Sequence, residues 1–291
     1  MKLRLDQMLV TRSLVLTRSQ AESYIALGKV SVNGRVITKS GYFVAPDAEI
    51  LLDQDEQFVS RAALKLKSVA EKLNLNFKGK VVLDIGSSTG GFTEFALSRG
   101  AKKVIAVDVG TDQLHPKLRH DPRIELHEKT DIRDFFLGKT GISADLPSKH
   151  RLGVGLSLQA TARSSASRSL PAAQPWTAKS VEVPNIVLID VSFISLREIL
   201  PHVAKNLSDK NTQIVAMVKP QFETGARVKN AGVVKNDTER RKILKDFETW
   251  AKQFFIIQDK KDSEVAGATG NRERFYLLNT IAVLEKPSTR R

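Results

Sequence analysis

The segment from Val81 to Phe92, VVLDIGSSTGGF, constrains the fold more than any other part of the chain. Its three leading apolar residues predict a buried strand, which an acid, Asp84, extends. A glycine-rich loop comes next, and a helical pattern runs from Phe92 to Leu97. Glycines between a strand and a helix let the backbone approach a ligand, and the first N–H groups of the helix point at it. The segment therefore predicts a ligand-binding corner of an α/β sheet.

The spacing of this loop narrows the choice of ligand. It reads D-x-G-x-x-x-G-G, whereas a dinucleotide fingerprint reads G-x-G-x-x-G, and no lysine follows that would make it a P-loop. The loop resembles motif I of S-adenosylmethionine-dependent methyltransferases, although a corner that binds nothing is the plainer alternative. The resemblance implies that the following residues contact S-adenosylmethionine: Asp84, Gly86, Ser87, Ser88, Thr89, Gly90, Gly91 and Phe92.

Composition limits the partners and the compartment. The 291 residues carry a net charge of +14, which favours a polyanion, nucleic acid first and an acidic membrane second. The absence of cysteine excludes disulfides and cysteine-ligated zinc and suits the cytoplasm, and the five histidines show no metal-ligand spacing. We therefore expect no metal site. No apolar run reaches about 18 residues, so we expect no membrane span either.

Residues 1–56 are predicted to form a small α+β domain. Helical spacing relates Leu3, Leu5, Met8 and Leu9, and Thr17 is placed to cap a second helix, Arg18 to Leu27. Asn33-Gly34 between two β-prone runs predicts a tight hairpin.

This domain resembles the RNA-binding module of ribosomal protein S-four. The likeness lies in RLD at 4–6, RSQA at 18–21 and GKVSVNG at 28–34. The 56 residues contain seven Lys or Arg and seven Asp or Glu, so RNA affinity would need clustered cations. We expect phosphate contacts from Arg4, Arg18, Lys29 and Lys39, the alternative being ordinary solvated charges.

After a linker at 57–60, residues 61–287 alternate between helical and strand patterns. Ser60 is predicted to cap a helix from Arg61 to about Leu73, and Asp237 to cap one that ends near Phe254; a further helix is expected at 196–207. Seven strands are expected, at 81–83, 103–109, 124–126, 186–189, 214–218, 255–258 and 275–283. This order predicts an α/β, Rossmann-like, seven-stranded and mostly parallel sheet with helices on both faces.

Residues 138–180 interrupt the alternation. They are rich in Ser, Ala and Gly, lack a clear period and carry six basic residues against one acid, Asp145. A compact α/β domain does not need so long a loop, so we interpret the segment as a flexible insertion.

Ligands of open α/β sheets bind beyond the carboxyl ends of the strands, and several charged residues are predicted there. Asp108 ends the second strand, where an acid accepts hydrogen bonds from ribose hydroxyls, and Asp131 lies in the loop expected near adenine. Asp190 and Lys219 end two further apolar strands, where an ion costs desolvation unless it faces a cleft or a partner.

With Lys65 and Glu273, these two residues match the order of the Lys-Asp-Lys-Glu tetrad of ribose 2′-O-methyltransferases. The chain resembles the FtsJ-like class and most closely the TlyA family, which joins an S-four-type module to an FtsJ-like domain. The likeness lies in SRAALKL, DIGSSTGGF, DVG, LIDVSFISL, VKPQFE and GNRER, and it fails over 138–180.

The resemblance implies methyl transfer from S-adenosylmethionine to ribose 2′-hydroxyls of ribosomal RNA, at cytidines of the small or large subunit. A sugar hydroxyl needs a base, and we expect Lys219 to be that base, with Lys65 placing the hydroxyl. Asp190 and Glu273 would orient the lysines. The partners would be ribosomal RNA or ribosomal subunits, in the cytoplasm.

Three alternatives stay open at this point. A non-catalytic RNA-binding factor for ribosome assembly would keep the fold without transferring a methyl group. A cytolysin is a second, because TlyA-like proteins carry the name haemolysin, although no strongly amphipathic surface helix is evident. A nicotinamide-dependent dehydrogenase is disfavoured by the loop spacing. The oligomeric state is open.

Overall fold

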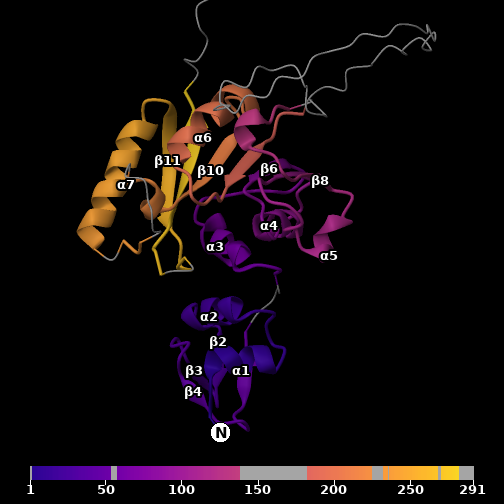
Figure 1. Cartoon of the computed structure of the whole chain (residues 1–291), viewed down its shortest axis with the longest axis vertical. Helices are drawn as coiled ribbons and strands as arrows, with labels where there is room; N and C mark the ends of the chain where they lie inside the picture. Colours follow the sequence, from indigo (N-terminus) through magenta and orange to yellow (C-terminus); the bar gives the residue numbers. More distant parts are fainter. Residues whose placement is uncertain are drawn as a thin grey trace, which may run out of the picture.

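The computed structural model describes residues 2–53, 58–137, 182–224, 232–234, 236–267 and 270–281. A small N-terminal domain is followed by a larger α/β domain (Figure 1). The insertion predicted at 138–180 lies outside the described residues.

The N-terminal domain packs two helices against short antiparallel strands. The helices are α1 (Leu5–Thr11) and α2 (Arg18–Ala26). The strand β2 (Val30–Val32) pairs with β3 (Arg35–Val36) and β5 (Ile50–Leu52), and β1 (Leu3–Arg4) pairs with β4 (Phe43–Val44). Thr17 and Gln20 form a reciprocal capping box at the start of α2. Asn33 and Gly34 have φ values of 47° and 76°, as a type I′ turn requires, so the predicted cap and hairpin are confirmed.

The α/β domain is built on a seven-stranded sheet with the order β11-β12-β10-β9-β6-β7-β8. Neighbouring strands from β10 to β8 are parallel, whereas β12 is antiparallel to both β10 and β11. The strands are β6 (Val81–Ile85), β7 (Lys103–Val107), β8 (Ile124–His127), β9 (Ile186–Ile189), β10 (Gln213–Val218), β11 (Phe255–Asp262) and β12 (Arg274–Thr280). The predicted seven-stranded, mostly parallel sheet is therefore confirmed.

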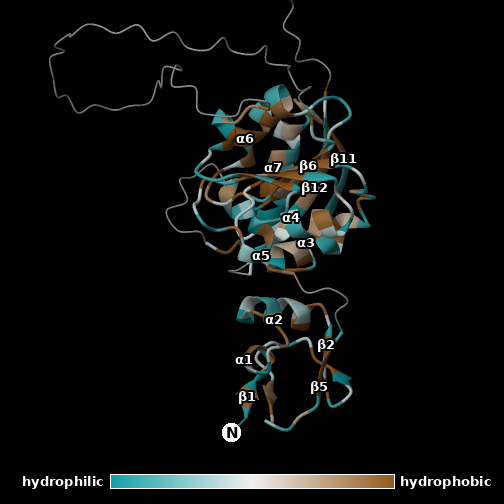
Figure 2. Cartoon of the chain, turned by 90° about the vertical axis from the view of Figure 1, so that its right-hand side faces the viewer, coloured by the Kyte–Doolittle hydropathy of each residue, from teal (hydrophilic) through white to brown (hydrophobic). Residues whose placement is uncertain are grey.

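Helices cover both faces of this sheet, because alternate strand residues point to opposite sides. The helices are α3 (Arg61–Ala70), α4 (Gly91–Ser98), α5 (Pro116–Arg119), α6 (Leu196–His202) and α7 (Asp237–Ala251). On β6, Val82 packs in the core with α3 and α4, whereas Leu83 and Ile85 pack in the core with α6 and α7. Figure 2 shows the apolar strands between the helices.

Several helix predictions were wrong in detail. Leu3, expected in the first helix, lies in β1, and the helices expected to end near Leu73 and Phe254 end at Ala70 and Ala251. The helix expected over 196–207 ends at His202 and continues as a wider π-helical turn, Val203–Leu207. Pro201 lies just before this change; it has no N–H to donate, and its ring crowds the preceding turn. Asn236, rather than Asp237, caps α7, because its side-chain oxygen accepts the N–H groups of Thr238 and Glu239.

The described part of the predicted linker, residues 58–60, is packed between the two domains. The side-chain amide of Gln20 in α2 donates to the Phe58 carbonyl oxygen at 2.5 Å, and the Phe58 ring is buried near Phe95. The Val59 N–H donates to the Glu94 carboxylate at 2.6 Å. Ser60 caps α3 by accepting the N–H of Ala62, as predicted. This segment therefore ties α2 to α3 and α4.

Close contact at Gly86 brings the ends of β6 and β9 together. The Asp190 N–H donates to the Ile85 carbonyl oxygen at 3.0 Å, and Gly86 has a φ of +80°. A Cβ atom at Gly86 would lie 2.5 Å from the Asp190 carbonyl oxygen. Only glycine fits here without moving one strand end away from the other.

We expect Gly86→Ala to lower the free energy of unfolding by about 1–3 kcal/mol more than Gly79→Ala does. Gly79 is the matched control because its φ is +69°, and a Cβ atom added there would have nothing within 4 Å. Both variants suffer backbone strain, but only Gly86→Ala collides with a neighbouring strand. Urea unfolding of the two variants measures the difference, and equal losses would contradict the contact.

Candidate active site

The glycine loop turns sharply from β6 into α4. Gly86, Ser88 and Gly90 have φ values of +80°, +46° and +92°, and Gly90 is the N-cap of α4. A Cβ atom at Gly90 would lie 2.4 Å from a terminal methyl of Leu118 and 2.7 Å from one of Leu114, so a larger residue would push these side chains aside and would be strained by the positive φ. The turn leaves the first N–H groups of α4 available to a bound group.

A cavity of about 140 Å³ joins this loop to two of the predicted strand-end ions. Its lining comprises Ser60, Ala62, Gly86, Ser87, Ser88, Thr89, Gly91, Phe92, Asp190, Ser192 and Lys219. The glycine loop, predicted to bind the cofactor, therefore shares one cavity with Asp190 and Lys219, predicted to be catalytic. The cavity lies at the carboxyl ends of the strands, where ligands of such sheets bind.

Lys219, at the end of β10, pairs with Asp190, at the end of β9. Its Nζ lies 2.6 Å from Asp190 Oδ1 and donates to Ser192 Oγ at 2.8 Å. The lysine side chain is about nine-tenths buried, and the parallel pairing of β9 with β10 brings the two strand ends side by side. The amine is thus held at the cavity wall by two oxygen atoms.

Lys65 and Glu273 form a second buried ion pair. Lys65 lies on α3 and Glu273 directly before β12, and Lys65 Nζ is 2.5 Å from Glu273 Oε2. Lys65 is 5% exposed and Glu273 3% exposed. Arg274 pairs with Val218 across β10 and β12, so the residues next to them, Glu273 and Lys219, lie at the same rim of the sheet. The structure thus brings together the four predicted tetrad residues as two ion pairs.

Asp84 faces the inside of the domain. It is fully buried, and the Thr93 hydroxyl on α4 donates to its Oδ2 at 2.6 Å. Burial raises the pKa of the Asp84 carboxyl to about 7, against the opposing effect of the Thr93 hydrogen bond. In this arrangement the side chain ties α4 to β6 beneath the loop, and its contact with a cofactor stays a prediction.

Asp108 and Asp131 are engaged with neighbouring backbone. Asp108 accepts the N–H groups of Ser88 at 2.8 Å and Gly110 at 2.7 Å, so it braces the glycine loop. Asp131 caps a 3₁₀ turn, Ile132–Asp134, and binds the Arg133 guanidinium, whose hydrogen bond lowers the pKa of the Asp131 carboxyl. Both acids therefore have a structural role, and their contact with cofactor stays a prediction.

Sequence reasoning missed two residues of the loop that follows Asp190. Ser192 lines the cavity, and its hydroxyl oxygen accepts a hydrogen bond from the Lys219 amine. Phe193 is 86% exposed, has a φ of +65°, and its ring centroid lies 5.3 Å from that of Phe222. An exposed aromatic residue in left-handed backbone costs on the order of 1–3 kcal/mol, which points to a functional constraint. The signal available was an apolar residue in a loop at a strand end.

Ser87 was predicted from the loop motif, and its environment is informative. It is 5% exposed, lines the cavity, and its hydroxyl has no hydrogen-bond partner among the described residues. A buried hydroxyl left unpaired is unfavourable, so this atom is suited to a polar ligand.

The predicted RNA-binding cations are only partly brought together. Arg4 binds Asp6 through two hydrogen bonds of 3.0 and 2.8 Å, and Arg18 binds the same carboxylate at 2.8 Å. Lys39 is exposed on the turn whose next residue, Ser40, accepts the Asp6 N–H. Lys29 lies beyond the opposite end of α2 from Arg18 and pairs with Asp53. Phosphate contact by these four residues stays a prediction.

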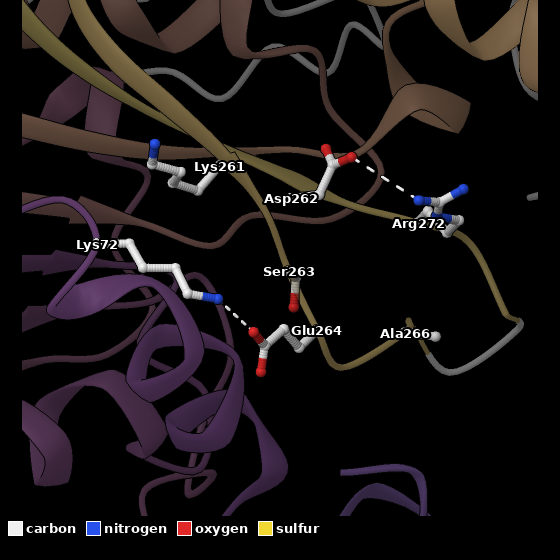
Figure 3. A pocket seen from close by; sticks show the side chains of 7 residues that line it. All are labelled: Lys72, Lys261, Asp262, Ser263, Glu264, Ala266 and Arg272. Atoms are coloured by element: carbon white, nitrogen blue, oxygen red, sulfur yellow. Dashed lines mark hydrogen bonds and ion pairs between the residues drawn. The ribbon is translucent and has the colours of Figure 1, made fainter.

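A larger groove of about 580 Å³ lies apart from the residues that line the glycine-loop cavity (Figure 3). Its cations already have partners: Lys72 with Glu264, Lys261 with Asp259, and Arg272 with Asp237. The smaller cavity, with its glycine loop and unpaired Ser87 hydroxyl, is therefore the better candidate for chemistry.

Two protein families match the sequence. The profile of FtsJ-like methyltransferases matches residues 58–280, and that of the S4 domain matches residues 3–50. The chain belongs to the FtsJ-like methyltransferase family. The first match contains the glycine loop and all four tetrad residues.

Relatives place the chain in the TlyA group of this family. It is 37% identical to the 23S rRNA (cytidine-2'-O)-methyltransferase TlyA of Campylobacter jejuni, over 76% of this chain and 70% of the relative. It is 32% identical to the 16S/23S rRNA (cytidine-2'-O)-methyltransferase TlyA of Mycobacterium tuberculosis, over 95% and 90%.

A solved structure of a Streptococcus thermophilus protein named as a hemolysin is 33% identical and superposes with a TM-score of 0.60. The match covers 97% of this chain and 89% of that one. Within the part of this chain that the structure describes, none of the helices combines the length and apolar character needed to cross a membrane.

We expect the Lys65–Glu273 pair to show strong thermodynamic coupling. Lys65→Met or Glu273→Leu alone leaves a buried charge without its partner, which costs roughly 3–5 kcal/mol, whereas the double variant removes both charges and regains much of that loss. A double-mutant cycle of urea unfolding measures the coupling.

The exposed Lys72–Glu264 pair is the matched control, with side chains about half exposed. Its coupling should be below about 1 kcal/mol. Equal coupling for the two pairs would contradict the buried arrangement.

Proposed function

We propose that this protein transfers a methyl group from S-adenosylmethionine to the ribose 2′-hydroxyl of cytidines in ribosomal RNA. The observation that carries the proposal is the shared cavity, in which the glycine loop lies beside the Lys219–Asp190 pair. The activities named for the TlyA relatives support the choice of nucleotide and RNA.

The cavity suits the amino-acid end of the cofactor. The first N–H groups of α4 and the unpaired Ser87 hydroxyl would bind its charged groups, along with loop residues Gly86 to Phe92. Asp108, at the end of β7, would accept from the ribose hydroxyls, while Val109 beside it is 71% exposed and offers an apolar surface for adenine. S-adenosylmethionine, when bound, supplies the methyl group and leaves as the neutral thioether.

Lys219 would act as the base. Its neutral amine accepts the hydroxyl proton as the ribose oxygen forms its bond to the methyl carbon. Asp190 and Ser192 hold the Nζ atom at 2.6 and 2.8 Å, which fixes its direction toward the cavity wall. Lys65, held by Glu273, would help place the hydroxyl, and this positioning supplies much of the rate.

Two surfaces would hold the RNA. Phe193, beside Ser192 at the cavity, presents an exposed ring that fits the stacking of an unpaired base, the mode by which proteins commonly hold single-stranded RNA. In the N-terminal domain, residues 1–56, Arg4, Arg18 and Lys39 would contact phosphates, with Lys29 at a separate point. Ribosomal RNA as substrate would place the protein in the cytoplasm.

The experiment is transfer of tritium from labelled S-adenosylmethionine to separate small and large ribosomal subunits, prepared with and without existing methylation. We expect label on unmodified particles only, in an alkali-stable dinucleotide that contains cytidine, because a 2′-O-methyl group blocks cleavage at that ribose. Lys219→Ala should lose at least about 100-fold in rate while keeping cofactor affinity, since removal of a positioned base costs about 10²–10⁴.

Lys210→Ala is the matched control, because Lys210 is an exposed lysine of the same domain outside the cavity. It should transfer label at the wild-type rate. Label on a base instead of a ribose, or none on any particle despite cofactor binding, would overturn the proposed reaction or its substrate.

A further inference from the structure

The connection between β11 and β12 carries Glu273, the residue that holds Lys65. Such a connection at the edge of a sheet has little around it to fix its position. Polar contacts nevertheless restrain it, from Arg240 of α7, Lys65 of α3 and Asp262 at the end of β11. None of these residues lines the glycine-loop cavity, whereas Asp262 lines the groove of Figure 3.

Arg240, in the first turns of α7, is the buried member of this network. It is 5% exposed, and its Nε donates to the carbonyl oxygen of Arg272 at 2.9 Å. Its Nη2 donates to Asp262 Oδ1 at 2.7 Å. One guanidinium thus fixes the backbone just before Glu273 and binds the end of β11 as well. The helix that bears it also contacts the turn Pro220–Phe222, which follows Lys219.

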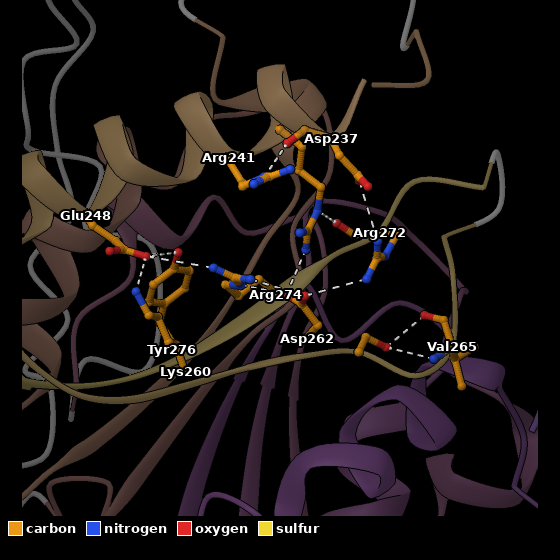
Figure 4. Close-up of polar contacts among 11 residues, drawn as sticks. Asp237, Arg241, Glu248, Lys260, Asp262, Val265, Arg272, Arg274 and Tyr276 are labelled. Atoms are coloured by element: carbon orange, nitrogen blue, oxygen red, sulfur yellow. Dashed lines mark hydrogen bonds and ion pairs between the residues drawn. The ribbon is translucent and has the colours of Figure 1, made fainter. Parts of the chain in front are cut away.

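Asp262 fixes the other side of Glu273. Arg274 donates to its carboxylate through Nε at 2.6 Å and Nη2 at 3.1 Å, and Arg272 Nη2 lies 3.9 Å away. Figure 4 shows Asp262 between Arg272 and Arg274. Burial works against ionisation, but the hydrogen bonds from Arg274 and Arg240 prevail and lower the pKa of Asp262 to about 2. The carboxylate is therefore charged at all working pH values.

Backbone contacts complete the restraint. The Ser263 N–H donates to the Glu273 carbonyl oxygen at 3.0 Å, and the Gly267 N–H donates to that of Asn271 at 2.8 Å. A Cβ atom at Gly267 would lie 2.9 Å from Glu273 Oε1, so the carboxylate packs directly against this glycine. Residues on both sides of Glu273 are held while its side chain points to Lys65.

The Arg240 guanidinium is buried, whereas the Asp262 side chain is 30% exposed. Such a pair is a poor source of stability, because desolvation of the buried ion offsets most of the attraction. An apolar pair of similar volume would hold α7 to β11 equally well. The charged pair adds a defined position of the backbone, because Arg240 also donates to the carbonyl oxygen of Arg272, next to Glu273. The network is therefore better suited to fixing geometry than to adding stability.

We propose that Arg240 and Asp262 are positioning residues for the Glu273–Lys65 pair, and that they fix Lys65 at the distance from Lys219 that methyl transfer requires. This inference rests on the proposed function for its catalytic consequence. Its structural half, the placement of Lys65 by the network, does not depend on which reaction the protein performs.

The test compares Asp262→Asn and Arg240→Met with Asp259→Asn. Asp259 is the matched control, a partly exposed acid of the same strand that pairs with Lys261. We expect kcat to fall roughly 10- to 100-fold in the first two variants, because a misplaced catalytic group lowers the rate by about that factor. The affinity for S-adenosylmethionine should be unchanged. Asp262→Glu, which keeps the charge, should recover part of the loss.

A second readout is the rate at which acetic anhydride acylates each lysine amine of the folded protein, measured by mass spectrometry. Lys65 should react faster in Asp262→Asn and Arg240→Met than in wild type, while Lys219 keeps its rate. Equal increases at both lysines, or activity like that of Asp259→Asn, would overturn the proposal. Should Arg240→Met not fold, Asp262→Asn, which preserves shape, decides alone.

The two readouts separate this proposal from the proposed function. If wild-type protein methylates no RNA, the function fails, and the acylation rates still decide whether the network places Lys65. If wild type is active and the variants match Asp259→Asn in both readouts, only the positioning proposal fails.

Discussion

The requirement to neutralise two buried lysines governs the arrangement of the site. Lys219 and Lys65 are nine-tenths or more buried, and an unpaired ammonium at such depth would be strongly destabilising. Each has one carboxylate within 2.6 Å, supplied by a different element: Asp190 from the end of β9 and Glu273 from the start of β12. These pairs form only if the ends of β6, β9, β10 and β12 lie close together. The close contact at Gly86 and the network around Asp262 are therefore required for the geometry of the site.

Much of this arrangement was predictable from the sequence because it depends on local pattern and on topology. The strand, glycine loop and helix from Val81 to Leu97 are local, and parallel strands necessarily present their carboxyl ends at one edge. Asp190 and Lys219 could therefore be placed together from their position after apolar runs. Lys65 was different: a lysine on a helix carries no signal, and only the family resemblance singled it out.

What the sequence could not supply is the set of contacts between distant segments. The two hydrogen bonds that occupy Asp108 and the burial of Asp84 against Thr93 depend on side-chain orientation, which no pattern encodes. The same holds for Arg240, which lies in an ordinary amphipathic helix yet donates to a backbone 32 residues away. Lys29 was grouped with Arg4 and Arg18 by motif, but α2 separates them. Ser192 and Phe193 were missed because loop residues have no period.

The measurement that tests the central claim most directly is the pH dependence of single-turnover methyl transfer, in wild type and in Lys219→Ala, with saturating cofactor and RNA. If Lys219 is the base, the wild-type rate rises with pH, because only the neutral amine accepts a proton. The variant should then be slow and show none of that rise. Comparable rates with the same pH dependence in both proteins would show that another group takes the proton, and the two ion pairs would be reduced to a structural role.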